Sequence, residues 1–225
     1  MVTRLSEADH VRVSAAIAAA EGTTAGEIVA VVTETSDPYH DVALHWSVLV
    51  LIGVLAWAAA CPSCLEWWWD RLIGGWHTGP STRELLTFLM ILAVAKFTAV
   101  LLILKYMPLR LLLTPGATKT RRVRRRALAV FKAAAERRTA GRTGILIYLS
   151  MGEHRAEIIG DEAITSVTTA ETWGEAMADL VAHVKQGRVA DGMVAAIEDI
   201  GVVLSEHFPR SAEDKNEIPD KLIEL

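Results

Sequence analysis

The sequence predicts an α/β domain that is split into two parts by a pair of membrane-spanning helices. A single apolar strand is expected near the start of the chain, two apolar runs follow it, and two more strands with amphipathic helices come after them. Apolar residues make up 52% of the 225 residues and charged residues 22%, which excludes a disordered chain and a charge-rich coiled coil. The two parts of the domain are therefore expected to fold together around one sheet.

The first part is predicted to occupy residues 1–41 and to hold one helix and one strand. Ser6 and Asp9 have the spacing of a capping box, so a helix is expected to begin there and to end near Gly22. Residues 27–33 form an apolar, mostly β-branched run without polar alternation, which is typical of a strand covered on both faces. Because a single strand is not stable alone, this one must find its partners in the second part.

Residues 42–107 are predicted to form a hairpin of two membrane-spanning helices. Its apolar runs, residues 42–61 and 85–104, are twenty residues long each. A helix of that length covers about 30 Å, the thickness of a hydrocarbon core. Tryptophans crowd the connection between the runs, as expected for rings at the headgroup level of a bilayer. These are Trp67, Trp68, Trp69 and Trp76.

The distribution of Lys and Arg predicts that both termini are cytoplasmic and that the connection lies outside. The connection carries only Arg71 and Arg83, whereas eight basic residues follow the second run closely. They are Lys105, Arg110, Lys119, Arg121, Arg122, Arg124, Arg125 and Arg126. The first forty residues lack the apolar core of a signal peptide, so the first run is expected to be its own insertion signal. We expect a two-span protein of the cell membrane, either plasma or inner membrane.

The segment of residues 108–142 is expected to contain a basic juxtamembrane stretch and a helix at residues 127–138. Residues 119–142 hold ten basic groups and one acidic group. Five of the arginines form a dense cluster, namely Arg121, Arg122, Arg124, Arg125 and Arg126. Basic clusters close to a membrane span contact anionic lipid headgroups, whereas a single-stranded nucleic-acid surface needs interleaved aromatic residues. The expected partner of the cluster is therefore the lipid bilayer and not nucleic acid.

Residues 143–209 are predicted to complete the domain. Two apolar runs, residues 145–150 and 155–159, are separated by a turn and indicate a strand hairpin. Helices with apolar faces follow, and the last one ends at Pro209. Because the strand at residues 27–33 reaches the second strand only through a long crossover, the two should be parallel, with the third running back. A polar tail is expected at residues 210–225.

Three carboxylates are expected at one edge of this sheet, where Glu27 begins the first strand and Asp161 and Glu162 follow the third. Together they could bind a hard cation such as calcium through oxygen ligands. The alternative is a solvated acidic rim, because residues 143–225 hold sixteen acidic and six basic groups. Asp37 and Asp41 are expected at the opposite edge, next to the membrane.

Two features of the hairpin each leave two interpretations open. Cys61 and Cys64 have the spacing of a redox pair at the outer surface, but they could also be two small residues at a helix end. Lys96 is the one charge within the second run, and it could make a functional or oligomer contact or be tolerated beside lipid. The sequence contains no phosphate loop, paired-histidine metal motif or dinucleotide fingerprint.

Four segments together, by their order and spacing, resemble a TPM domain, and most closely the bacterial membrane-protein branch whose domain is split by a hydrophobic insertion. The segments are residues 26–32, 141–150, 153–164 and 187–193, the last before a helix that ends at His207, Phe208 and Pro209. The resemblance implies a small three-layer α/β/α fold. It also implies calcium binding, which occurs in some members, and an acid phosphatase activity, which is described for a chloroplast member.

Two functions follow as expectations. We prefer a membrane-anchored, non-enzymatic accessory or interaction module with calcium at the acidic sheet edge, because no nucleophile with a general acid is recognisable. The alternative is a membrane-bound, acid phosphatase-like hydrolase of phosphate esters, which rests on the resemblance alone.

Overall fold

The computed structural model describes residues 5–73, 79–134, 141–211 and 216–225. The chain divides into two compact units. The α/β unit comprises Met1–Asp37 and Gly116–Leu225, and the helical unit comprises Pro38–Pro115. The α/β unit is thus discontinuous in sequence, and the helical unit is inserted between its first strand and its second.

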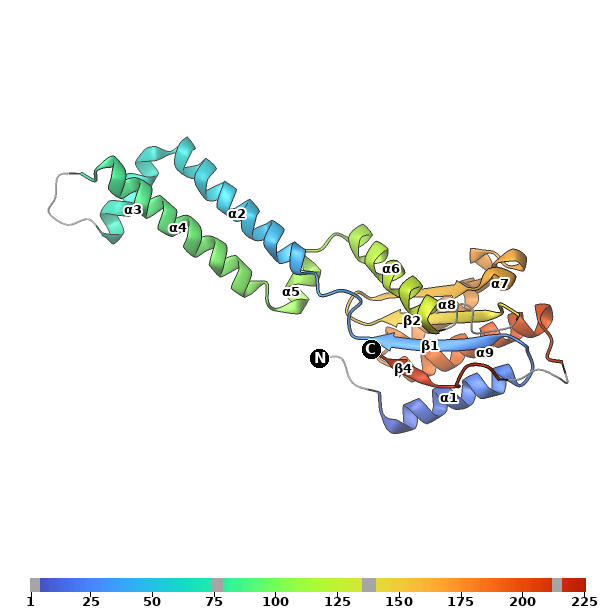
Figure 1. Ribbon diagram of the computed structural model, residues 1–225. Helices are drawn as coiled ribbons and strands as arrows, with labels where there is room; N and C mark the ends of the chain where they lie inside the picture. Colours follow the sequence, from blue (N-terminus) through green and yellow to red (C-terminus); the bar gives the residue numbers. More distant parts are fainter. Residues whose placement is uncertain (1–4, 74–78, 135–140, 212–215) are drawn as a thin grey trace. The chain divides into compact units, whose positions relative to one another are not determined.

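The α/β unit is built on a four-stranded sheet of order β3-β2-β1-β4 (Figure 1). Strand β1 (Glu27–Thr33) pairs in parallel with β2 (Gly144–Ser150), so that Glu27 lies opposite Gly144 and Thr33 opposite Ser150. Strand β3 (Arg155–Gly160) runs antiparallel to β2. The predicted pairing of the isolated first strand with a strand from the second part of the chain is confirmed.

The fourth strand, β4 (Leu222–Glu224), pairs in parallel with the other side of β1. The expectation of a polar tail at residues 210–225 is therefore wrong for its last residues. Leu222 is buried, and the backbone N–H of Leu225 donates to the carbonyl of Val32 at 3.1 Å. A strand of three residues shows no periodicity that a sequence pattern could reveal. Its presence makes β1 an interior strand of the sheet.

Helices cover both faces of the sheet, which confirms the three-layer α/β/α fold (Figure 1). Helix α6 packs on one face, where Val29 and Val31 of β1 join its buried residues. The other face carries three helices and packs on Ile28 and Ala30. The bounds are Gly116–Ala134 for α6, Glu7–Glu21 for α1, Gly174–Val184 for α8 and Val189–His207 for α9. Two short helices, α7 (Glu162–Val167) and η1 (Ala170–Trp173), connect β3 to α8.

Two of these helices show how local sequence sets the ends of an element. Helix α1 begins at the expected capping box, in which the hydroxyl of Ser6 accepts from the N–H of Asp9 at 3.2 Å and the Asp9 carboxylate accepts from the N–H of Ser6 at 3.1 Å. Helix α6 begins at Gly116, eleven residues before the expected helix. The arginines obscure its apolar stripe, which consists of Val123, Ala127 and Phe131 at intervals of four residues.

The helical unit contains two helices that are long and apolar enough to cross a membrane. They are α2 (His40–Ala60) and α4 (Thr82–Ile103), and they correspond to the two predicted spans. The connection contains a further helix, α3 (Pro62–Leu72), whose Trp69 meets Phe88 of α4 edge to face with ring centroids 5.6 Å apart. Trp76 lies outside the described residues.

A buried arginine joins two chain segments within the helical unit. Arg110 of α5 (Met107–Leu112) is 6% exposed, and its Nε donates to the carbonyl of Leu104 at 2.7 Å. Its Nη1 donates to the carbonyl of Pro38. Leu104 caps the carboxyl end of α4, where helical carbonyls lack partners. Arg110 thus holds the end of α4 against the start of the helical unit, a role that its place among the basic residues after the second apolar run does not indicate.

Candidate functional site

The sheet edge with the predicted carboxylates is formed as expected. Glu27 and Gly144 lie opposite each other, and the backbone N–H of Asp161 donates to the carbonyl of Gly144 at 2.8 Å. The start of β1, the start of β2 and the end of β3 therefore meet at one edge of the sheet. This arrangement follows from the parallel pairing of β1 with β2 and the antiparallel return of β3.

Each of the three carboxylates at this edge has its own protein partner. Glu27 is 5% exposed, and its two oxygens accept from the backbone N–H groups of Glu217 and Ile218, each at 3.1 Å. Asp161 caps α7, because its Oδ1 accepts from the N–H of Glu162 at 2.7 Å. The Glu162 side chain forms an ion pair with Arg142. The structure thus brings the three residues to one edge but binds them separately.

The side chains of Glu27, Asp161 and Glu162 are not arranged to bind one calcium ion together. Among the described residues, no group of three or more His, Cys, Asp or Glu side chains is arranged to hold a metal ion. The Oδ2 atom of Asp161 is buried and has no hydrogen-bond partner in the part of the chain that the structure describes, as a metal-ligand oxygen would require. Glu27 and Glu162, however, are held by N–H groups and by a guanidinium. Calcium binding by these residues stays a prediction.

Glu21, the last residue of α1, is a buried acid at this edge that the sequence analysis missed. It is 8% exposed, and its Oε1 accepts from the N–H of Ile28 at 2.7 Å. Burial, and to a lesser degree the nearby carboxylates of Glu27 and Asp220, raise the pKa of Glu21 to about 9, although the hydrogen bond from Ile28 opposes this rise. The side chain is therefore protonated at neutral pH. No feature of the sequence distinguishes it from a solvated glutamate at a helix end.

A second buried carboxylate, Glu153, closes the opposite edge of the sheet. It is 2% exposed, and its Oε1 accepts from the N–H of Ser36 at 2.8 Å while the hydroxyl of Ser150 donates to its Oε2. The hydroxyl of Ser36 lies 3.1 Å from that of Tyr148, and burial raises the pKa of the Tyr148 phenol. These contacts fix the loops that follow β1 and β2. Glu153 lies in a turn, where a carboxylate normally indicates only solvent exposure.

Asp37 connects this edge to α6. Its Oδ1 lies 2.7 Å from Nη1 of Arg122, and its Oδ2 lies 3.2 Å from Nη2 of Arg125. Two of the five arginines predicted to contact lipid therefore bind a protein carboxylate. Asp41, which was expected beside Asp37, belongs to the helical unit, in the first turn of α2.

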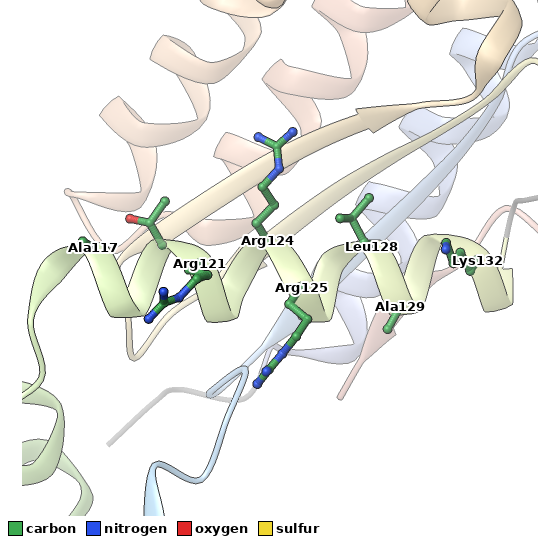
Figure 2. Close-up of a pocket in the computed structure, with 8 residues that line it drawn as sticks. Ala117, Arg121, Arg124, Arg125, Leu128, Ala129 and Lys132 are labelled. Carbon is green, nitrogen blue, oxygen red and sulfur yellow. The ribbon is translucent and has the colours of Figure 1, made fainter. Parts of the chain in front are cut away.

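The outward face of α6 forms a shallow, open, basic surface (Figure 2). We call it the α6 basic face. Its residues recur at intervals of three and four, on the side of the helix next to the buried stripe. They are Ala117, Thr120, Arg121, Arg124, Arg125, Leu128, Ala129 and Lys132. Leu128 is 38% exposed, so the face presents an apolar side chain among its positive charges.

The charges of α6 also act on the sheet beside the α6 basic face. Burial raises the pKa of Glu157 on β3, and the positive charge of Arg124 opposes that rise. Arg126, which is exposed, similarly opposes the effect of burial on the pKa of Tyr148. Within the predicted cluster, Arg121 is exposed to solvent. The arginines therefore divide into those bound to the domain and those available to an outside anion.

Lys96 lies on an exposed side of α4. In the described ranges it forms no ion pair with an acidic side chain. Both interpretations of this lysine, a contact with another molecule and a charge tolerated beside lipid, remain predictions.

Residues 109–203 of this chain match the TPM domain family. They contain α6, β2, β3, α8 and most of α9. The matched part of the TPM domain lacks β1 and β4, although β1 lies at the centre of the sheet. The α/β unit thus completes the TPM domain with elements from both ends of the chain.

The fold is similar to the NMR structure of the BA42 protein from the psychrophilic bacterium Bizionia argentinensis. The TM-score is 0.57, with 18% sequence identity over 99% of this chain and 97% of that chain. At this identity the similarity shows the fold alone. The comparison with curated proteins gave no match.

Proposed function

We propose that this chain is a TPM-domain protein anchored in the cell membrane, where it serves as a non-enzymatic accessory or interaction module. The observation that carries the proposal is the insertion of two helices of membrane-spanning length and apolarity between β1 and β2. An even number of spans returns the chain to its starting side, so both parts of the TPM domain can build one sheet on the same side of a bilayer. The excess of Lys and Arg after α4 favours the cytoplasmic side.

The α6 basic face supports contact with anionic lipid headgroups. Helix α6 begins shortly after the second apolar helix in the sequence, which keeps its arginines within reach of a membrane surface. Each basic residue near an anionic surface contributes about 1 kcal/mol. Arg122 and Arg125 are partly neutralised by Asp37, so Arg121, Arg124 and Lys132 are expected to make the main contacts, with Leu128 at the headgroup boundary.

The buried acids of the TPM domain support a module without catalysis of its own. Glu27, Glu21 and Glu153 each accept a backbone N–H, which is the behaviour of residues that hold loops and strand ends. A hydrolase would need a nucleophile beside a base at an accessible surface. The phosphatase alternative rests on the family resemblance, and no contact in the described residues favours it.

Chemical labelling of lysines tests the lipid contact. The full chain is placed in nanodiscs of phosphatidylcholine alone or of phosphatidylcholine mixed with phosphatidylglycerol, and acylation by a succinimidyl ester is followed by mass spectrometry. Lys132 should react more slowly in the anionic discs. Lys185, which is exposed at the end of α8 on the opposite layer, should react equally in both and is the matched control.

Charge reversal at Arg121 and Arg124 should restore the labelling of Lys132 in anionic discs to the rate seen in neutral ones. Equal labelling of Lys132 in both discs by the unmodified protein would contradict the lipid contact. Hydrolysis of p-nitrophenyl phosphate by the same preparation would instead favour the phosphatase alternative.

A further inference from the structure

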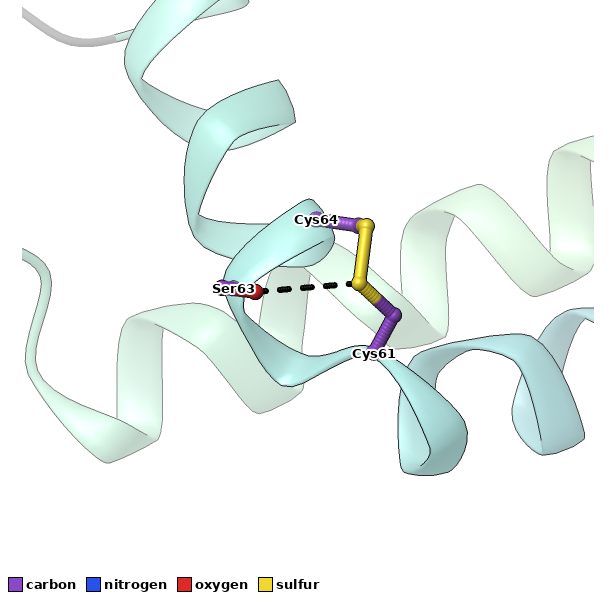
Figure 3. The surroundings of a disulfide bond; sticks show 3 residues. All are labelled: Cys61, Ser63 and Cys64. Atoms are coloured by element: carbon purple, nitrogen blue, oxygen red, sulfur yellow. Dashed lines mark hydrogen bonds between the residues drawn. A yellow bond between two sulfur atoms is a disulfide. The ribbon is translucent and has the colours of Figure 1, made fainter.

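Cys61 and Cys64 form a disulfide at the junction of α2 and α3 (Figure 3). Cys61 is the cap at the amino end of α3, and Pro62 begins the helix. The N–H of Cys64 donates to the carbonyl of Cys61 at 3.0 Å, and the Ser63 hydroxyl lies 3.7 Å from the Cys61 sulfur. Both cysteines are partly exposed, and the two residues between them are exposed.

This disulfide adds little to the stability of the helical unit. It closes a loop with only two intervening residues, and the loss of chain entropy that stabilises a cross-linked protein is small for so short a loop. The two cysteines are also joined by a backbone hydrogen bond of the first helical turn. The α2–α3 corner is packed independently, because Ala58 and Leu65 are buried against Phe88. A stabilising role therefore does not explain the bond.

We propose that Cys61–Cys64 is a thiol–disulfide exchange site whose substrates are proteins or peptides with a cysteine pair. Three features support reactivity at Cys61. Cys61 caps the amino end of α3, where the helix dipole favours a thiolate. The Ser63 hydroxyl can donate to that sulfur. The exposed Pro62 and Ser63 leave the bond open to an attacking thiol.

The exchange balances within the two cysteine pairs. A thiolate of the substrate attacks Sγ of Cys61, the Cys61–Cys64 bond breaks, and its electron pair leaves on Sγ of Cys64, which takes a proton from water. The second substrate thiolate then attacks the substrate sulfur of the mixed disulfide and releases Cys61 as a thiolate. The substrate is oxidised to a disulfide, and Cys61–Cys64 is reduced by two electrons. The reverse sequence reduces a substrate disulfide.

Glutathione serves as the probe, with the full chain in detergent micelles and mixed disulfides quantified by mass spectrometry. In Cys64→Ser, Cys61 should form a mixed disulfide with oxidised glutathione about tenfold faster than Cys64 does in Cys61→Ser. In the wild type, reduced glutathione should open the bond without denaturant. Because the probe is soluble and the protein is in micelles, the result does not depend on the lipid contact or topology proposed above.

Ser63 is a positioning residue in this proposal, and its variants separate its role from packing. Ser63→Ala, made in the Cys64→Ser background, should slow the reaction of Cys61 about threefold, because a hydrogen bond to a charged group is lost. Ser63→Thr keeps the hydroxyl and should keep the rate. Thr87→Ala, which removes a hydroxyl bonded to a carbonyl of α4, is the control and should change nothing.

Two results would overturn the proposal. One is a wild-type disulfide that resists excess reduced glutathione until the chain is denatured, as structural disulfides do. The other is equal reaction rates for Cys61 and Cys64 in the two single-cysteine variants, which would remove the assignment of Cys61 as the attacked sulfur.

Discussion

The carboxylate of Glu27 accepts a hydrogen bond of 3.1 Å from the backbone N–H of Ile218, which attaches the end of the chain to the first residue of the central strand. The other oxygen of Glu27 accepts from Glu217, and Ile218 is itself buried among the residues that face α6. Strand β4 begins only four residues later. One buried carboxylate therefore helps the backbone pairing to hold β4 beside β1.

Replacement of Glu27 should loosen this attachment. Glu27→Ala leaves two N–H groups without their acceptor, so we expect the unfolding free energy of the TPM domain to fall by about 1–3 kcal/mol. Glu27→Gln keeps one acceptor oxygen and should cost less. The measurement is the urea midpoint of protease resistance for the full chain in detergent. Glu34→Gln, at an exposed position just after β1, should leave the midpoint unchanged. A midpoint for Glu27→Ala equal to that control would refute the role.

The ion pairs of Asp37 should differ in strength because their arginines differ in exposure. The Arg122 side chain is 15% exposed and that of Arg125 is 74% exposed. Exposed pairs contribute about 0–1 kcal/mol, and shielding from water strengthens the attraction. Double-mutant cycles with Asp37→Ala should therefore give a larger coupling energy for Arg122→Ala than for Arg125→Ala. The reverse order would mean that the exposed pair dominates, against this reasoning.

Glu21 should make the TPM domain less stable as the pH rises. Its pKa is raised from 4.5 to about 9 by burial, so the folded state binds a proton that the unfolded state has lost. The stabilising contribution of the neutral acid is complete below pH 4.5 and is lost progressively up to about pH 9. Glu21→Gln is always neutral and keeps an acceptor for Ile28. It should raise the melting temperature at pH 8 and change it little at pH 4.5.

The same pH series includes a control for surface charge. Glu206→Gln removes an exposed carboxylate near the end of α9 and should shift the melting temperature equally at both pH values. If Glu21→Gln behaved like Glu206→Gln, the Glu21 side chain would be ionised in the folded protein, and the raised pKa would be wrong.

The proposed topology places both termini in the cytoplasm. A fluorescent protein that folds only in the cytoplasm should fluoresce when it is fused after Leu225, and an export-dependent alkaline phosphatase should be inactive there. The same phosphatase inserted at Pro80, between the two apolar helices, should be active. Phosphatase activity at Leu225 together with inactivity at Pro80 would show the opposite orientation.

The sheet was largely predictable because its main strands have strong local signals. Residues 27–33 and 145–150 are continuous apolar runs, and the long connection between them permits the parallel pairing that a short hairpin would exclude. Strand β4 was not predictable, because three residues carry no pattern and its place depends on a side chain far away in the sequence. The start of α6 was missed because the arginines in its first half obscure the apolar pattern of its buried stripe.

The site was less predictable than the fold for one physical reason. The sequence correctly predicts that Glu27, Asp161 and Glu162 lie at one edge of the sheet, because the directions of the strands determine this placement. The partners of these carboxylates are backbone N–H groups and an arginine from a turn, and no residue pattern indicates a backbone donor. The same limit applies to Glu21 and Glu153, whose burial arises only when distant segments pack.

The discontinuity of the TPM domain also sets an order of events during biosynthesis. The ribosome synthesises β1 before β2, and the 110 residues from Glu34 to Thr143 must be translated between them. At about 5–20 residues per second, this delay lasts about 5–20 s. During that time both apolar helices leave the ribosome while β1 has neither of its neighbours. The sheet can therefore close only after both apolar helices have been made, so a folded α/β unit marks a chain from which these two helices have already left the ribosome.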